Sequence, residues 1–371
     1  MPRALAALTA LVLCLAFALP APARTEYPEG WPWHGAAILS GSLTAQDVMA
    51  LPGIIDLNFV AIQIMPRLRA SREHIAPEEA LEKEFAWATE MLDACRQAHL
   101  RALLVWYNIP IDPNLGFDQQ KPQFWDDPAQ VAEMVRLGGV LAQRFKNRGS
   151  ELAGYQIQSE PVVYVAGRPR LPEVWPDALD RIIRAIRAQD PDRWIAASLT
   201  MGGSPDYAGC KPLPYPRIIY NAHMYWPHAY TYQGMFEYKA RPSYPGWTGL
   251  TYLDRKALAR TLTPLALFSS TYGVPVWIGE FSAVRWAEGA EQYLRDTVSL
   301  FNDFGFSWSY FSLGAFHCWN PDYNTQYSEV SDRATWTSQY VGQNSTRWST
   351  LRELFTKRHP GSPAAPLGKN P

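Results

Sequence analysis

The sequence predicts an α/β fold, a single (β/α)8 TIM barrel with long loops at the C-terminal face of its strands. Eight short apolar segments alternate with amphipathic, helix-like segments along nearly the whole chain. Such alternation is typical of a parallel sheet covered by helices, and eight units suffice to close it into a barrel. The chain of 371 residues is 47% hydrophobic and 19% charged, which suits one large core. An open, doubly wound sheet is the alternative.

The predicted strands are apolar runs bounded by turn residues. They cover residues 34–41, 57–65, 101–108, 152–161, 194–200, 217–225, 274–283 and 306–313. Apolar residues at helical spacing predict six helices, over residues 76–100, 127–148, 176–189, 254–273, 290–305 and 345–358. Between the fifth and sixth strands the segment 201–216 is rich in Gly and Pro and predicts no helix.

Both ends of the chain differ from the barrel in composition. Residues 1–23 hold one charge, a long Ala/Leu stretch and small residues at the exit, which predicts a cleaved signal peptide and a secreted or periplasmic protein. Residues 24–358 form the predicted catalytic domain, and 359–371, rich in Pro, Gly and Ala, a flexible tail. Because no later run reaches about 20 apolar residues, we expect no membrane insertion after signal cleavage.

Charge and cysteine content narrow the possible partners. The net charge is -1 and the basic residues are scattered, so nucleic acid is not an expected partner, and we expect a monomer. Cys95, Cys210 and Cys318 remain after cleavage, and their spacing matches no zinc site. Cys95 is expected in the core, whereas a disulfide between Cys210 and Cys318 is left open.

Two carboxylates stand where predicted strands end. Glu160 ends the fourth strand and Glu280 the seventh, on opposite sides of a barrel whose active site forms at the C-terminal strand ends. A retaining glycosidase needs two carboxyl groups about 5 to 5.5 Å apart, although either residue alone could be a solvated strand end. His223 and Tyr225 share one side of the sixth strand. Tyr225 is a candidate donor to Glu280, and His223 a candidate for proton transfer or for binding a sugar hydroxyl.

Four segments, in this order along the chain, resemble glycoside hydrolase family 5, the cellulase family of clan A: "GYQIQSEP", "AIRAQDPDRWIAAS", "IIYNAHMYWPHAYTYQG" and "VPVWIGEFSA". The resemblance implies that Glu160 is the acid/base, Glu280 the nucleophile, and that His223 and Tyr225 support them. It implies a retaining hydrolase that cleaves a β-linked polysaccharide. The substrate would be a β-glucan similar to cellulose, or an exopolysaccharide. No metal or organic cofactor is implied, because two glutamates suffice for the chemistry.

The chain also departs from the family pattern around the two carboxylates. The departures are Ser159 for the asparagine before the acid/base, Ala61 at the arginine of strand two, Tyr107 and Asn108 near the histidine of strand three, and Phe311 at the stacking tryptophan of strand eight, with Trp308 and Trp319 close by as substitutes. These changes leave room for an unusual specificity. They also keep open two alternatives, a barrel that binds polysaccharide without cutting it and a transglycosylase.

Aromatic residues in the loops after the strands predict a sugar-binding groove, since an indole matches the flat C–H face of a pyranose ring. The loop tryptophans are Trp125, Trp175, Trp226, Trp247, Trp286 and Trp319, of which we expect two or three to line the groove, with residues 228–250 as one wall. The predicted substrate-binding set is Ser159, Asn108, Tyr107, Trp226, Trp308, Phe311, Trp319 and Trp286.

Overall fold

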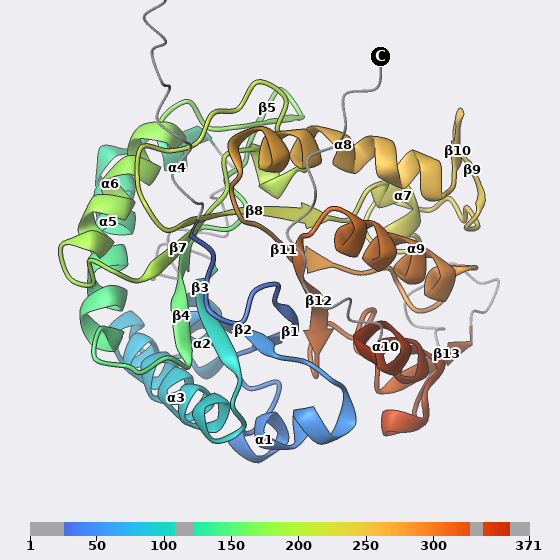
Figure 1. The fold of residues 1–371 in the computed structure, drawn as a ribbon, viewed down its shortest axis with the longest axis horizontal. Coiled ribbons are helices and arrows are strands. Elements are labelled where there is room, and N and C mark those ends of the chain that lie inside the picture. The colour runs from blue at the N-terminus through green and yellow to red at the C-terminus, as the bar shows by residue number, and fades with distance from the viewer. Residues whose placement is uncertain (1–25, 108–121, 327–336, 357–371) are drawn as a thin grey trace, which may run out of the picture.

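The computed structural model describes residues 26–107, 122–326 and 337–356 and confirms the (β/α)8 barrel. Eight parallel strands close in the order β1-β12-β11-β8-β7-β4-β3-β2, so that each predicted strand pairs with the next one along the chain (Figure 1). The strands are β1 (His34–Leu39), β2 (Phe59–Ile64), β3 (Arg101–Trp106), β4 (Leu152–Ile157), β7 (Trp194–Ala197), β8 (Ile218–Met224), β11 (Val276–Phe281) and β12 (Ser307–Leu313). Closure rules out the open sheet. The predicted signal peptide and tail lie outside the described residues.

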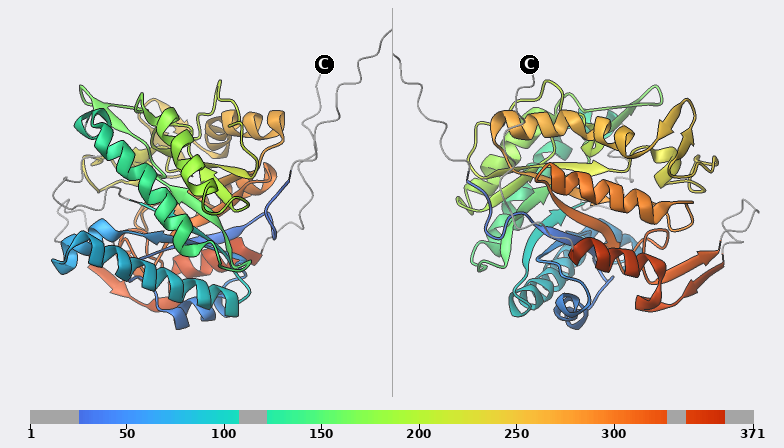
Figure 2. Two further views of the ribbon diagram at one scale, coloured as in Figure 1. Left: turned by 90° about the vertical axis from the view of Figure 1, so that its left-hand side faces the viewer. Right: turned by 45° about the vertical axis from the view of Figure 1, so that its right-hand side comes forward.

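All six predicted helices form, and they cover the outside of the barrel (Figures 1 and 2). They are α3 (Pro77–Gln97), α5 (Pro128–Phe145), α6 (Trp175–Arg187), α8 (Arg255–Tyr272), α9 (Ala290–Asp303) and α10 (Thr346–Thr356). The carboxylates of Asp127 and Asp254 accept backbone N–H groups at the starts of α5 and α8. As predicted, only a short 3-10 turn, Met201–Gly203, lies between β7 and β8.

The structure adds helices that the sequence pattern did not predict. They are α1 (Ala45–Ile54), α2 (Pro66–Glu73), α4 (Pro122–Asp126) and α7 (His228–Thr231). α1 begins with a capping box in which Thr44 and Asp47 bond each other's backbone N–H, a signal present in the sequence. Pro52 and Gly53 near the end of α1 weaken its helical pattern, which explains why it was missed.

Three two-stranded hairpins extend the C-terminal face of the barrel. They are β5 (Val163–Val165) with β6 (Arg168–Arg170), β9 (Gly246–Thr248) with β10 (Thr251–Leu253), and β13 (Tyr323–Gln326) with β14 (Thr337–Tyr340). Each lies in the connection that leaves the C-terminal end of a barrel strand, namely β4, β8 and β12. The predicted long loops on this face therefore carry structure of their own.

The cysteines and the helices bear on two further expectations. Cys95 is fully buried in the core, as predicted. Cys210 and Cys318 are not joined by a disulfide bond, so that open possibility is not realised. Within the described ranges, no helix combines the length and the apolar character that a bilayer crossing needs.

The packing of α6 allows a test of the core. Ile183 is completely buried on the face that α6 turns to the barrel and α5. We expect Ile183→Ala to lower the free energy of unfolding by about 2–5 kcal/mol, because it removes apolar contacts and leaves a cavity. Leu267→Ala, at a 51% exposed position of α8, is the matched control and should change it by less than about 0.5 kcal/mol. Chemical denaturation of both variants measures the difference, and equal effects would contradict the assigned core.

Candidate active site

The two carboxylates reach the mouth of the barrel from opposite strands. Glu280 is in β11, and its Cα pairs with that of His223 in β8. Glu160 follows β4 by three residues, on a turn in which Gln158 has a left-handed φ of 56°. Ser198 Oγ donates to the carbonyl of Ser159 at 2.7 Å and so holds this turn against β7.

His223 stands between the two glutamates. Its Nδ1 lies 2.7 Å from Glu160 Oε1 and 3.8 Å from Glu280 Oε2. One ligand atom from each of the three side chains falls within 4.8 Å of the others. The sequence-predicted pair therefore converges on one small space, with Glu280 and His223 buried and Glu160 part-exposed.

Both oxygens of Glu280 accept a hydrogen bond from a neutral side chain. Tyr225 OH donates to Oε2 at 3.1 Å, and Gln63 Nε2 donates to Oε1 at 2.8 Å. Burial raises the pKa of Glu280, while His223 and these two donors act in the opposite direction. Burial opposes the charged form of His223, yet the two carboxylates together raise its pKa above the ordinary value.

Gln63 is a site residue that the sequence prediction missed. The prediction placed Ala61 at this point of the second strand, and the structure corrects it. Residues two apart on a strand face the same side, so Ala61 lies on the Gln63 side of β2 but one layer deeper in the barrel, away from the mouth. The available signal was a glutamine at the end of an otherwise apolar run, "FVAIQI", where a buried amide needs a polar partner.

Gly279 gives the site the room it needs. The ladder between β11 and β8 shifts register between Ile278 and Glu280, where Gly279 lies. A Cβ on Gly279 would stand 2.3 Å from Asn221 Oδ1 and 3.3 Å from His223 Nε2. Only glycine therefore lets Asn221 and the imidazole approach the strand that carries Glu280.

Two other predicted residues border Glu160. Burial, the two carboxylates and a hydrogen bond with Glu160 raise the pKa of Tyr107 well above its usual value, so its phenol stays protonated beside Glu160. Ser159 is buried, and its Oγ has no hydrogen-bond partner within the described part of the chain. Asn108 lies outside the described residues.

The predicted aromatic residues divide into two groups. Trp319 stacks on Tyr225 at 5.3 Å between ring centroids and meets Phe311 edge-on at 5.7 Å, so these rings wall the site beside Glu280. Trp226, next in sequence to Tyr225, is half-buried. Trp308 is fully buried and stacks on His34, which corrects its predicted role in binding.

The remaining loop tryptophans are also mostly structural. Trp286 is 9% exposed, and its indole N–H donates to the carbonyl of Gln233, so it fixes the loop after β8 and offers little face to a sugar. Trp125 and Trp175 are buried and pack edge-to-face. Of the six loop tryptophans, Trp226 and Trp247 are those with substantial exposure.

Glu160, His223 and Glu280 lie close enough together that their donor atoms could hold a metal ion. Each of them already takes part in the hydrogen bonds described above, including both oxygens of Glu280. This network needs no metal to hold the three side chains in place, and we assign none.

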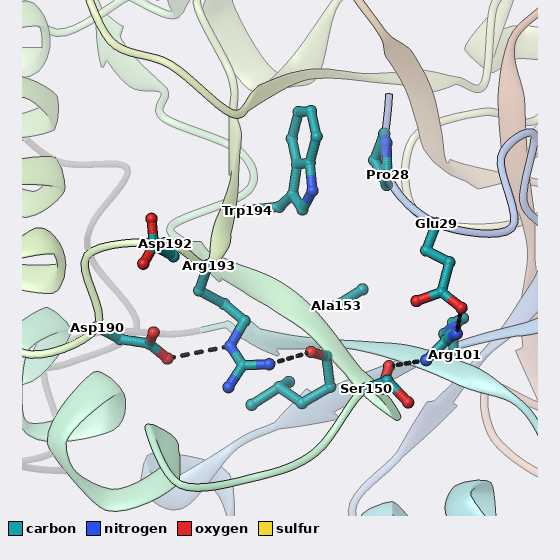
Figure 3. Close-up of a pocket in the computed structure, with 10 residues that line it drawn as sticks. Pro28, Glu29, Arg101, Ser150, Ala153, Asp190, Asp192, Arg193 and Trp194 are labelled. Carbon is teal, nitrogen blue, oxygen red and sulfur yellow. Dashed lines mark hydrogen bonds and ion pairs between the residues drawn. The ribbon is translucent and has the colours of Figure 1, made fainter. Parts of the chain in front are cut away.

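A cavity of about 350 Å³ lies at the other end of the barrel (Figure 3). It is lined by Arg101, Leu152 and Trp194, which are the first residues of β3, β4 and β7. Arg193 is bound there to Asp190 and to the carbonyl of Leu152. The N-terminal face of such barrels serves stability, so we read this cavity as a feature of the closed barrel end and not as the site.

Paired carboxylates at the mouth of a parallel eight-stranded barrel define the class of TIM-barrel glycoside hydrolases. The model of one family in that class, Cellulase (glycosyl hydrolase family 5), matches residues 33–317. The chain belongs to this family, whose members are glycoside hydrolases. The resemblance inferred from its motifs is thereby confirmed.

Solved structures share the fold at low identity. A glycoside hydrolase is 20% identical with a TM-score of 0.66, covering 87% of this chain and 99% of its own. Thermotoga maritima Cel5A in complex with cellobiose is 17% identical with a TM-score of 0.62, covering 86% and 97%. The cellulose synthase subunit Z (CcsZ) from Clostridioides difficile is 13% identical with a TM-score of 0.63, covering 87% and 100%. A search of the curated proteins found no match.

Gly279→Ala tests the close packing beside Glu280. The added methyl would overlap Asn221 Oδ1, so Asn221 and His223 must move, and a displacement of this kind lowers turnover by about 100-fold. Gly139→Ala is the matched control, because its Cβ would make an ordinary contact of 3.6 Å with Ala185 O and alanine favours the helix. Hydrolysis rates and thermal unfolding of both variants are measured. Full activity in Gly279→Ala would refute the packing argument.

Proposed function

We propose that this protein is an exported retaining glycoside hydrolase that cleaves β-linked polysaccharide by double displacement with two glutamates. The observation that carries the proposal is the meeting of Glu160 and Glu280 oxygens within 4.8 Å around His223. Retaining enzymes need carboxyl groups about 5 to 5.5 Å apart, whereas inverting enzymes leave about 6.5 to 9.5 Å for a water molecule. Export rests on the composition of residues 1–23.

The geometry suggests a role for each carboxylate in the first step. Glu280 is buried and held by donors on both oxygens, so its carboxylate is oriented to attack the anomeric carbon. Glu160 is more exposed and faces the same space, where its carboxyl proton passes to the departing glycosidic oxygen. The C–O bond to the leaving sugar breaks as the ester bond to Glu280 forms.

The second step restores both groups. Glu160, now a carboxylate, takes a proton from a water molecule that attacks the anomeric carbon, and the ester bond to Glu280 breaks. The sugar leaves with the configuration it had at the start. The substrate and one water molecule are the reactants of the cycle, and both glutamates return to their starting protonation states.

Substitution of the two glutamates tests the mechanism. Glu160→Gln should lower turnover by about 10²- to 10⁴-fold, because general acid and base catalysis is lost, and Glu280→Gln should abolish it. Glu133→Gln, on the exposed face of α5, is the matched control and should keep normal activity. Release of reducing ends from β-glucans, mannans and exopolysaccharides is measured for folded proteins.

Three outcomes would contradict parts of the proposal. Near-normal turnover in folded Glu160→Gln or Glu280→Gln would contradict the catalytic role assigned to that glutamate. A glycan retained by the protein with no reducing ends released indicates a binding barrel, and longer chains among the products indicate a transglycosylase. An inverted anomer in the first product, seen by NMR, excludes double displacement.

The hairpin β9–β10 supports a polymeric substrate. Trp247 and Tyr252 face each other across the two strands, with their rings 5.4 Å apart, and are 66% and 45% exposed. The hairpin stands out from the body beside the start of α8 (Figures 1 and 2). No charged residue lies between Arg241 and Asp254, so this surface suits a neutral chain that offers C–H faces and hydroxyls.

Trp247→Ala tests the contribution of this hairpin. It should raise KM for a polysaccharide about 2- to 10-fold at unchanged kcat and leave a short chromogenic glycoside unaffected, because one stacking surface is lost. Tyr272→Ala, at a 44% exposed aromatic position at the end of α8, is the control. An equal change in KM for the polysaccharide and for the short glycoside would show that the hairpin does not contact the polysaccharide away from the cleavage site.

A further inference from the structure

A histidine supplies the positive charge beside the two carboxylates. In the described ranges, His223 is the residue that makes ion pairs with Glu160 and Glu280, and no arginine or lysine lies within ion-pair distance of either. Two close carboxylates in a poorly solvated site repel each other, and a nearby cation lowers the free-energy cost of that repulsion. Here the compensating cation is one that can lose its charge near neutral pH.

The group that contacts Glu280 from β2 carries no charge. Gln63 is 3% exposed and donates to Glu280 Oε1, so it orients the carboxylate and favours its ionised form only through a hydrogen bond. The strand end that carries Gln63 is anchored, because the Met65 N–H donates to the buried Glu84 at 2.7 Å. The Gln63 amide is therefore held by an anchored backbone in a position to donate to Glu280.

The other ionisable side chains near the cluster do not replace this cation. Burial raises the pKa of Tyr107, Tyr225 and Tyr232 well above the usual value, so these phenols remain neutral. His228 is exposed to solvent, and partial desolvation of its ring lowers its pKa despite the opposing effect of Glu160. Among the described residues, His223 is thus the cationic group in direct contact with the two carboxylates.

We propose that Gln63 is a positioning residue that orients Glu280 without supplying charge, and that His223 and Glu160 share one proton. On His223 this proton supplies the positive charge between the two carboxylates, and on Glu160 it is the proton given to the leaving group. This inference rests on the proposed function and specifies the pH range of the same site. Glu160 and His223 hold one proton between them across their 2.7 Å contact, and they titrate with Glu280 as a unit. Activity is then lost at low pH when Glu280 takes a proton, and at high pH when the shared proton leaves.

Two substitutions of Gln63 separate orientation from charge. Gln63→Met removes the donor, so Glu280 binds a proton more readily; the acid limb of kcat/KM should rise by about one pH unit, and kcat should fall roughly tenfold at similar KM. Gln63→Arg adds a donor and a fixed cation. It should regain part of that kcat, and both limbs should move down by about one pH unit, since the cation favours the deprotonated forms.

Gln156→Met is the matched control. Gln156 is an equally buried glutamine in the neighbouring barrel interior, and its amide reaches Ser198 and neither catalytic carboxylate. It should lower stability much as Gln63→Met does and leave both pH limbs where they are. Identical shifts of the two pH limbs in Gln63→Met and Gln156→Met would show that loss of packing causes the effect. That result would overturn the positioning role of Gln63.

A second measurement does not depend on catalysis. The 15N signals of the His223 imidazole, assigned with a His223→Asn variant, are followed through pH in each folded protein. We expect the midpoint for His223 to fall by about one pH unit in Gln63→Arg and to change little in Gln156→Met. An unchanged midpoint in Gln63→Arg overturns the charge inference. If the natural protein cuts no glycan at all, the glycosidase proposal fails, and this titration still decides the role of His223.

Discussion

The closeness of two carboxylates in a largely buried mouth is the constraint on which the rest of this structure depends. Carboxylate oxygens of Glu160 and Glu280 approach within 4.8 Å. Two negative charges at that distance repel each other strongly, because the protein interior screens charge less than water does. The surrounding side chains offset this repulsion in two ways. His223 contributes charge, while Gln63 and Tyr225 contribute directed hydrogen bonds to Glu280.

The barrel supplies the alignment that such a cluster needs. Because β8 and β11 are neighbours, the pairing of His223 with Glu280 is a property of the ladder and not of flexible loops. The register shift at Gly279 then lets the imidazole and Asn221 come close to the backbone of β11. Deeper in the barrel, Asn221 donates to Ser198, and Ser198 donates to the turn before Glu160. One hydrogen-bonded chain thus links the supports of both glutamates.

The sequence alone was sufficient for the barrel and for the two carboxylates as candidates, because both depend on patterns along single strands. Apolar runs and helical spacing identify elements, and strand ends identify the face where a site forms. The sequence alone was not sufficient to predict contacts between strands, because these depend on the height of each residue along the barrel axis. Ala61 and Gln63 have the same orientation on β2, and only the closed barrel shows that Gln63 is level with Glu280. Trp308 likewise belongs to the core, although its distance from Phe311 in sequence suggested the site.

The residues around the two carboxylates share a location, since Gln63, Tyr107, Ser159 and Phe311 all stand at or near C-terminal strand ends. Such positions can change without disturbing the core, because the apolar interior of each strand lies below them. What changes is the environment of the carboxylates. A buried serine hydroxyl without a partner at Ser159 and a neutral amide at Gln63 leave His223 as the neighbouring group able to carry charge. The fold therefore fixes the distance between the two acids, while the side chains at the strand ends set the charge and the hydrogen bonds around them.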